Sequence, residues 1–264
     1  MRLLPTFFFV CCLFLGCSNE LPKNQISQSD GKISPRLIVP IKFKDFTVND
    51  ITEGLDALFD AKISIGEGKG QSYEFMRLKF DDPDSYLITE TANQYLDARN
   101  RGAMPMTTYD ITMSSWFNGV VPVLVFLKEC KYSNMSFMVD DLMDLSVSFL
   151  PWVGSEEREQ IESDSASGLT LRNYFKKELI TEVPRESDFE IGFKMQNRYE
   201  LVVTEHARGD YDGDGYEDSL ITVAKVYLEG SGRDYSAYLV SRTSHKLPMK
   251  IDLFLLPKKS DANR

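Results

Sequence analysis

The part of the chain after Pro184 constrains the fold most, because it consists of strand-like segments joined by short connections. These segments are rich in apolar, β-branched and aromatic residues, a composition that favours strands. Together with helical patterns earlier in the chain, they predict an α+β fold, mainly antiparallel sheet with a few helices. The expected strands cover residues 189–195, 199–207, 219–228, 235–243 and 249–256.

Helical patterns lie mostly before Pro184. Asp50 is expected to cap a helix, with Glu53 at the capping-box position and an apolar face that includes Leu55 and Phe59. A second helix is expected from Asp84 or Ser85 to Arg99. Two more helices are expected at Ser155–Ser163 and Thr170–Leu179, and strands at Arg36–Phe43 and Tyr73–Phe80.

A β-hairpin is expected in the middle of the chain. Thr107–Phe117 is rich in strand-forming residues, Asn118-Gly119 is a favoured type I′ turn, and Val120–Leu127 is a nearly continuous apolar run. Pro122 then predicts a bulge or an edge position in the second strand. Further strands are expected at residues 132–139 and 144–150.

The organisation of the chain follows from these segments. We expect an α+β region at residues 37–184 and a β-rich region at residues 185–264, which together can form a single domain. Hydrophobic residues make up 42% of the chain, enough to bury a core. The run Gly66–Gly70 is interpreted as a flexible turn, because it lacks the closing Lys-Ser/Thr of a phosphate-binding loop.

The N-terminus has the pattern of an export signal. Met1-Arg2 is followed by the apolar run Leu3–Leu15, which at about 13 residues is shorter than the roughly 20 that cross a bilayer. The run ends in Leu15-Gly16-Cys17, which resembles the bacterial lipobox. That resemblance implies that residues 1–16 are removed and that Cys17 carries acyl chains such as palmitate. An ordinary secretory signal and an uncleaved anchor are the alternatives.

The segment after Cys17 is expected to be a tether. Residues 17–36 are polar and are interrupted by prolines and a glycine, a composition typical of a flexible linker. Ser18 directly follows the lipobox cysteine, and by the same resemblance it implies the outer membrane. We therefore expect a lipid-anchored protein of the cell envelope, on the outer membrane and facing the periplasm.

Charge and cysteine content narrow the possible partners. The formal net charge is −10, and the loss of residues 1–16 removes only Arg2, which gives −11. Such a chain lacks the basic face that nucleic acid requires, so no nucleic-acid partner is expected. After processing, Cys130 is the only cysteine besides Cys17, which leaves no internal disulfide. Cys130 is interpreted as a small buried hydrophobic residue.

The most acidic stretch of the chain is Asp210–Asp218, with the sequence DYDGDGYED. Close pairs of carboxylates at about 4–5 Å repel each other by several kcal/mol at an effective dielectric near 20. A bound cation removes that repulsion, and Ca²⁺ takes six to eight oxygen ligands in flexible geometry. Gly213 and Gly215 allow the positive φ of a tight loop. The pattern therefore predicts a calcium site.

The flanks and spacing separate this loop from an EF-hand. Ile221 stands at the twelfth position, where an EF-hand has a bidentate glutamate, and strands flank the loop. The pattern D-h-D-x-D-G-x-x-D resembles the calcium-binding hairpin loops of FG-GAP repeats. By this resemblance Asp210, Asp212, Asp214 and Asp218 are side-chain ligands, Tyr216 supplies its carbonyl, and Glu217 points to solvent. A surface Asp-Gly turn without a metal and a Mg²⁺ site are the alternatives.

The sequence contains few signs of catalysis. It has no G-x-S-x-G and no H-E-x-x-H motif, and only two histidines, His206 and His245. Trp116 and Trp152 can line a glycan surface or fill the core. We therefore favour a non-enzymatic binding, assembly or inhibitor module with an unidentified envelope partner. The alternative is a calcium-dependent hydrolase that acts on envelope polymers.

Overall fold

The computed structural model describes residues 31–51, 54–65, 75–80, 86–136, 141–152, 154–185, 187–195, 198–228, 233–242 and 249–256. The expected signal at 1–16, most of the tether, the Gly66–Gly70 turn and His245 lie outside these ranges. The described chain already contacts the fold before Leu37, the expected start of the folded part. Ile33 pairs with Ser133 through backbone hydrogen bonds of 2.8 and 3.0 Å.

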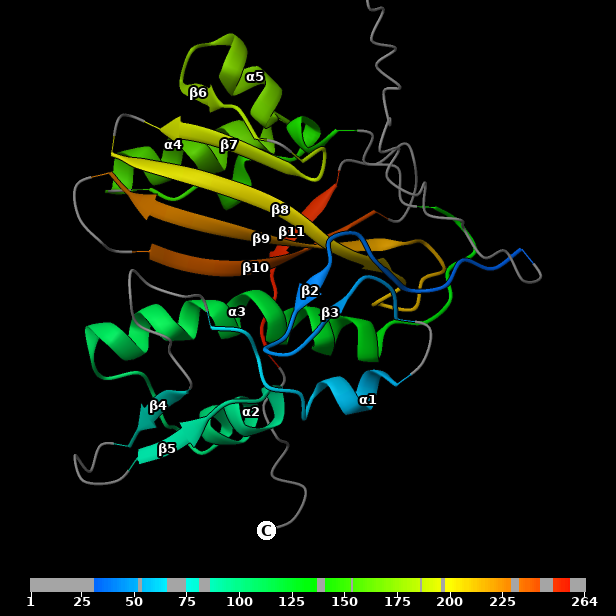
Figure 1. The fold of residues 1–264 in the computed structure, drawn as a ribbon. Helices are drawn as coiled ribbons and strands as arrows, with labels where there is room; N and C mark the ends of the chain where they lie inside the picture. Colours follow the sequence, from blue (N-terminus) through cyan, green and yellow to red (C-terminus); the bar gives the residue numbers. More distant parts are fainter. Residues whose placement is uncertain are drawn as a thin grey trace, which may run out of the picture.

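A seven-stranded sheet organises the molecule, and the α+β fold class is confirmed (Figure 1). All of its pairings are antiparallel, in the order β11-β10-β9-β8-β7-β6, with β1 pairing with β8 as well. The five strands expected after Pro184 are present, and β6 was not predicted. The strands are β1 Arg36–Leu37, β6 Ile180–Val183, β7 Glu190–Met195, β8 Tyr199–Gly209, β9 Asp218–Tyr227, β10 Arg233–Ser241 and β11 Lys250–Leu253.

A β-bulge in β8 changes which side chains face each side of the sheet. The register shifts between Glu205 and Ala207, so His206 is an extra residue opposite β9. Ala207 therefore faces the same side as Thr204, and Arg208 reaches Glu205 on the opposite side. The bulge lies where β7 ends and β1 takes over the pairing with β8.

One face of the sheet packs against helices from residues 141–176. Leu201, Val223 and Val240 of the sheet contact Leu145 and Leu171 in one hydrophobic cluster. The helices expected at Ser155–Ser163 and Thr170–Leu179 are present, with shifted ends. The strand expected at 144–150 is wrong, because capping by Asp141 and Ser146 produces single helical turns there. These elements are η1 Leu142–Asp144, η2 Val147–Phe149, α4 Ser155–Ala166 and α5 Leu171–Lys176.

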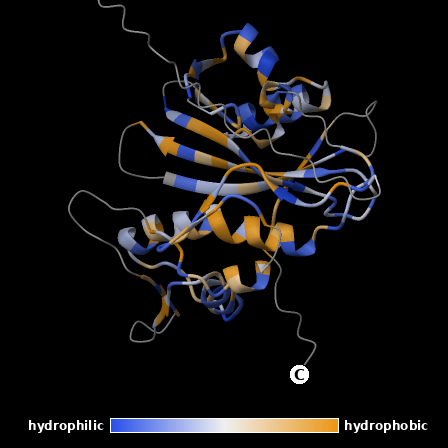
Figure 2. Ribbon diagram, turned by 45° about the vertical axis from the view of Figure 1, so that its right-hand side comes forward, coloured by the Kyte–Doolittle hydropathy of each residue, from blue (hydrophilic) through white to orange (hydrophobic). Residues whose placement is uncertain are grey.

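The opposite face of the sheet packs against one long helix, α3 Thr108–Glu129 (Figure 1). The hairpin expected at 107–127, with its turn at Asn118-Gly119, is therefore wrong. Thr107 caps the helix through a hydrogen bond from the Asp110 amide, and the run Val121–Leu127 is buried. An apolar run of this kind suits a buried helix as well as a buried strand, so periodicity did not separate them. Figure 2 shows this apolar stretch of α3 below the sheet.

The helix α3 also meets the length and composition criteria for a membrane span. However, 67% of its most apolar 18-residue window is buried inside the protein. That burial is typical of a core helix in a water-soluble fold.

Short elements from the N-terminal part of the chain pack around α3. The helix expected from Asp84 or Ser85 begins only at Ala92, because the β-branched segment before it forms β5. Of the helix expected from Asp50, the described residues contain the single turn after Gly54. The expected strands at 36–43 and 73–80 are present only in part. The elements are β2 Ile41–Lys42, β3 Thr47–Val48, α1 Leu55–Leu58, β4 Met76–Lys79, β5 Tyr86–Thr89 and α2 Ala92–Asn100.

Candidate metal centre

The acidic loop joins β8 to β9 and is supported from the side by residues 131–135. Lys131 pairs with Asp210, and the amide of Asn134 donates to the Gly215 carbonyl at 2.8 Å. Gly213 and Gly215 have φ values of 82° and 92°, the left-handed conformation that glycine adopts without strain. The expected turn chemistry is therefore present.

Backbone amides of the loop hold two buried aspartates in place. The Asp210 carboxylate accepts hydrogen bonds from the amides of Gly213 at 2.7 Å and Gly215 at 3.0 Å. The Asp218 carboxylate accepts from the amides of Tyr211 at 2.8 Å and Asp212 at 3.3 Å. Asp210 is 3% exposed and Asp218 is 1% exposed. These carboxylates are thus part of the loop's own architecture.

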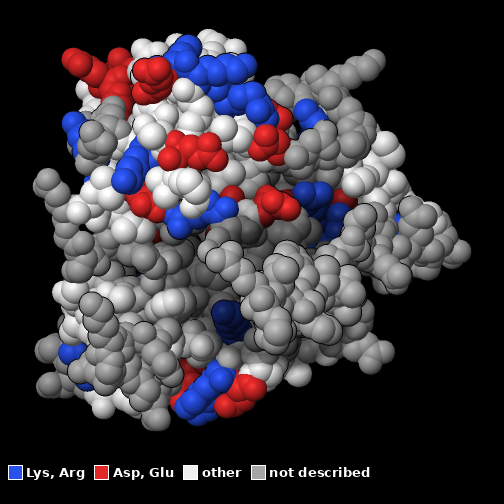
Figure 3. Space-filling view, turned by 45° about the horizontal axis from the view of Figure 1, so that its top comes forward, with Lys and Arg blue, Asp and Glu red and all other residues white. Residues whose placement is uncertain are grey.

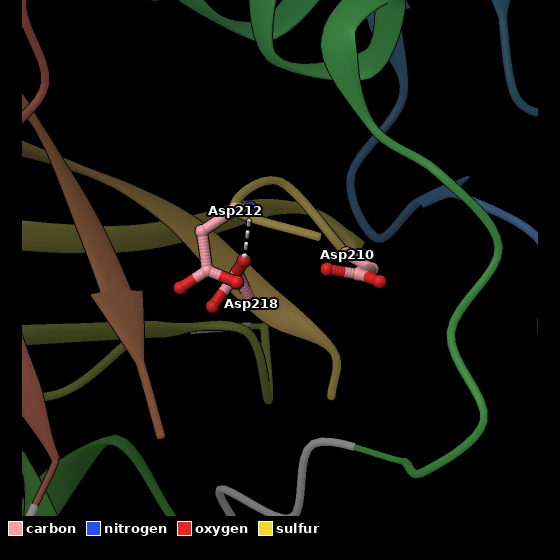
Figure 4. Close-up of side chains that lie close together, drawn as sticks. All are labelled: Asp210, Asp212 and Asp218. Carbon is pink, nitrogen blue, oxygen red and sulfur yellow. Dashed lines mark hydrogen bonds between the residues drawn. The ribbon is translucent and has the colours of Figure 1, made fainter. Parts of the chain in front are cut away.

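Asp210, Asp212 and Asp218 form a cluster that can hold a metal ion (Figure 4). Each contributes a carboxylate oxygen, and these oxygens all lie within 4.8 Å of one another. Figure 4 shows Asp212 and Asp218 side by side, with Asp210 approaching from the other strand end of the loop. The acidic loop therefore presents a set of hard oxygen donors, the type that oxygen-seeking divalent cations prefer.

The other two expected ligands lie outside this cluster. The Asp214 carboxylate accepts the Tyr216 amide at 2.8 Å, and Asp212 in turn accepts the Asp214 amide at 3.1 Å. Asp214 is exposed. The cluster thus includes three of the four aspartates predicted as ligands, and Asp214 borders it.

Glu217 does not face solvent, so that part of the prediction is wrong. Its side chain is fully buried, and its carboxylate accepts hydrogen bonds from both terminal nitrogens of Arg36, one of them at 3.2 Å. The reason is the neighbouring strand β1, which brings Arg36 beside the end of β8. Sequence reasoning found no signal for this pair, because 181 residues separate its members.

The three clustered aspartates lack the basic partners that other buried acids in this sheet have. Glu205 pairs with Arg208 at 2.7 Å, and Glu217 pairs with Arg36. Within the ranges that the structure describes, no lysine or arginine forms an ion pair with Asp210, Asp212 or Asp218. Backbone amides make the direct contacts to the two buried carboxylates, and the Lys131 ammonium lies beside Gly213 of the loop.

The pKa values of the loop reflect this imbalance. The pKa of Asp218 is raised to about 7, first by burial and then by the charges of Asp212 and Asp214, against the lowering effect of two amide hydrogen bonds. Burial and the neighbouring aspartates also raise the pKa of Asp214. A cation at the cluster would reverse these effects by favouring the ionised carboxylates.

An aromatic side chain anchors the loop to the core. Tyr211 stacks on Phe126 of α3 with ring centroids 5.5 Å apart, and it contacts Phe254 edge-on at 5.4 Å. The position of the loop is therefore coupled to the packing of the long helix. This role of Tyr211 had no signal in the sequence beyond its apolar position in the loop pattern.

The candidate nucleophile and bases are not arranged for catalysis. Burial, together with Asp218 and Asp210, raises the pKa of the Cys130 thiol and keeps it protonated. Burial lowers the pKa of His206 to about 4, and its Nε2 lies 2.8 Å from the Thr222 hydroxyl. Cys130 packs against Gly209 and His206 lies in the bulge, and no hydrogen bond joins them in the described part of the chain.

Comparisons with known proteins add no family. No protein-family model matches the chain, and neither a curated protein nor a solved structure is significantly similar to it.

Proposed function

We propose that this protein is a calcium-binding lipoprotein of the bacterial cell envelope that acts without catalysis, as a binding, assembly or inhibitor module. The observation that supports the metal site best is the cluster of Asp210, Asp212 and Asp218 on a hairpin loop, with which no described lysine or arginine forms an ion pair. Calcium is the metal that we propose, because a flexible loop of carboxylates and carbonyls suits its large, irregular coordination shell. Magnesium demands octahedral geometry and retains its waters.

The full ligand set that we propose also includes Asp214 and the carbonyl of Tyr216. Asp214 follows Asp212 by two residues and is exposed, so a rotation of its side chain directs an oxygen toward the cluster. Calcium would then receive at least five protein oxygens, with waters to complete the shell. The loop bridges β8 and β9 and contacts residues 131–135, so the ion would tie three segments together.

The lipid anchor rests on Leu15-Gly16-Cys17 and the apolar run before it. Cys17 would hold the protein in the outer membrane, with the fold in the periplasm. Fatty-acid labelling in cells tests this part: label is expected on the natural protein and not on Cys17→Ala. An unlabelled natural protein would remove the anchor from the proposal and leave the metal site unaffected.

A non-enzymatic role is favoured over hydrolysis of envelope polymers because the protonated thiol of Cys130 and the neutral His206 offer no activated nucleophile. The inhibitor version needs an acidic surface for a basic partner. On the face shown in Figure 3, acidic and basic side chains are interspersed, so that face favours a neutral partner.

Metal titration tests the central part of the proposal. Calcium is expected to bind the purified protein with one-to-one stoichiometry in calorimetry, and magnesium is expected to bind far more weakly. Asp212→Asn removes a ligand charge and should abolish binding. Asp45→Asn, an exposed aspartate between β2 and β3, is the matched control and should bind as the natural protein does. Heat of binding that Asp212→Asn leaves unchanged would refute the site.

A further inference from the structure

A second site is suggested by a cleft of about 680 Å³ on the face of the sheet that carries α3. Its floor is formed by β8 and β9, and its walls by α3 and the segment Val39–Lys42. Pockets that hold small ligands typically measure about 300–1,000 Å³ and combine apolar walls with a few convergent polar groups. The acidic loop contributes no residue to this cleft.

The floor of the cleft carries hydroxyl groups and a neutral imidazole. Thr204 and Thr222 are 8% and 4% exposed, and their hydroxyls contact Glu190 at 3.2 Å and His206 at 2.8 Å. The bulge in β8 places His206 beside Thr204 on this face while Ala207 continues into the core. β-Bulges often direct side chains in this way next to binding sites. The floor thus offers both donors and acceptors without a net charge.

The charged residues of the cleft balance one another. Arg185 forms an ion pair with Glu200, and the two side chains are 27% and 23% exposed. Gly192 makes room for this arginine, because a Cβ atom there would clash with its guanidinium group. Glu190 and Lys42 add one charge of each sign to the lining. A strongly charged ligand therefore gains little here, and a neutral polar ligand is not repelled.

The helix wall provides an aromatic surface and open space. Trp116 lines the cleft and is 40% exposed. One turn further along α3, a Cβ atom added to Gly119 would meet no heavy atom within 4 Å. An exposed indole next to free volume is suited to stack against a flat apolar ligand surface.

We infer that this cleft binds a neutral saccharide, with the apolar face of a sugar ring on Trp116 and its hydroxyls on the Thr204, Thr222 and His206 floor. A sugar ring is the ligand class that combines one apolar face with many hydroxyls and no charge. This site is independent of the proposed metal centre.

Direct binding measurements test this inference with neutral trisaccharides: maltotriose, cellotriose and N,N′,N″-triacetylchitotriose. At least one is expected to bind the natural protein saturably, equally in calcium and in chelator. Gly119→Leu fills the open space and should abolish binding while the melting temperature stays equal or rises, because leucine favours a helix more than glycine does. Trp116→Ala should raise Kd at least tenfold.

Trp152→Ala is the matched control, because Trp152 is 50% exposed and lies under Arg158, outside the lining of the cleft. It should bind the trisaccharide as the natural protein does. The inference is overturned if none of the three probes binds saturably, or if Gly119→Leu leaves binding unchanged. Tighter binding of a charged tripeptide than of every trisaccharide would also overturn it.

Discussion

Acidic residues lie along β8 and in the loop that joins it to β9, but their charges are balanced in different ways. Near the cleft, Glu200 pairs with Arg185, and at the bulge Glu205 pairs with Arg208. In the acidic loop, Asp210, Asp212 and Asp218 lie together, and no lysine or arginine in the described part of the chain forms an ion pair with them. The same hairpin therefore contains carboxylates that are paired within the protein and a cluster of carboxylates that can hold a metal ion.

The contrast is sharpest within the loop itself. Glu217 and Asp218 are adjacent and both buried, yet Glu217 is bonded to Arg36 while Asp218 has only backbone amides and a pKa raised to about 7. Burial of a carboxylate is costly unless a partner compensates for it. A high content of acidic residues is thus a poor guide to a metal site, and the absence of an internal partner is a better one.

The largest effect on stability is expected for Glu217, a buried carboxylate that has a basic partner. Glu217→Ala leaves Arg36 without its carboxylate, and removal of one member of a buried pair typically costs about 3–5 kcal/mol. The free energy of unfolding, measured with urea in chelator, should fall by about 3 kcal/mol. A loss below about 1 kcal/mol would show that the pair contributes little and would weaken the comparison.

A stability effect of similar size is expected when calcium binds the cluster of Asp210, Asp212 and Asp218. Calcium at a hundred times its Kd should stabilise the natural protein by about 2.7 kcal/mol relative to chelator. Asp210→Asn should lose this gain entirely, because Asp210 supplies both a ligand and the hydrogen bonds that shape the loop. Thermal melting in calcium, in magnesium and in chelator measures it. Equal midpoints in all three solutions would contradict the metal site.

A smaller effect of opposite sign is expected from Asp218→Asn without metal. The amide keeps an oxygen for the Tyr211 amide and removes a buried charge, so stability in chelator should rise by about 1 kcal/mol. In calcium the same variant should be less stable than the natural protein. A variant that is destabilised in both solutions would show that Asp218 is already neutralised within the protein.

Asp218 and His206 should make the stability of the protein depend on pH in opposite directions. The folded pKa of Asp218, about 7, lies above its usual 3.8, so metal-free stability from this group falls as pH rises from about 4 to 7. The folded pKa of His206, about 4, lies below its usual 6.5, so stability from this group rises as pH rises through about 4 to 6.5. Urea unfolding in chelator separates them. Asp218→Asn should show only the rise, and His206→Gln only the fall.

The smallest effect is expected for Cys130, whose side chain packs beside Gly209 at the start of the acidic loop. Cys130→Ser places a polar hydroxyl in the space beside Gly209 and should lower stability by about 1 kcal/mol or less. The redox behaviour should not change, since Cys130 forms no disulfide. Loss of more than about 3 kcal/mol would indicate that the thiol has a packing role that its partial burial does not suggest.

The sequence predicted local features well and distant contacts poorly. The β8–β9 hairpin and its acidic loop follow from alternation, turn residues and charge spacing within about 30 residues, and the structure contains them. The sequence of α3 predicts a hairpin instead of a helix, because Asn118-Gly119 is a strong turn signal and the apolar run lacks a clear period. Burial in the tertiary structure makes this segment helical, as often happens where local propensity is ambiguous.

The candidate site shows the same division. The spacing of the aspartates and the resemblance to FG-GAP loops predict Asp210, Asp212, Asp214 and Asp218 as ligands, and the structure brings three of them together, Asp210, Asp212 and Asp218. The partner of Glu217, the support from residues 131–135 and the stacking of Tyr211 on Phe126 all come from segments far away in the chain. One sequence contains no pattern that links such residues. The cleft was missed for the same reason, although Trp116 had been noted as a possible glycan contact.

The short strand β1 also determines which end of the molecule a tethered protein would present. Residues 31–37 run beside the acidic loop, where Ile33 pairs with Ser133 and Arg36 reaches Glu217. A chain anchored at Cys17 would have only residues 18–30 between the bilayer and this point, a root-mean-square span of roughly 20 Å for a flexible linker. The loop would then lie on the membrane-proximal side of the fold. Divalent cations that gather at anionic head groups would be concentrated next to the same three aspartates.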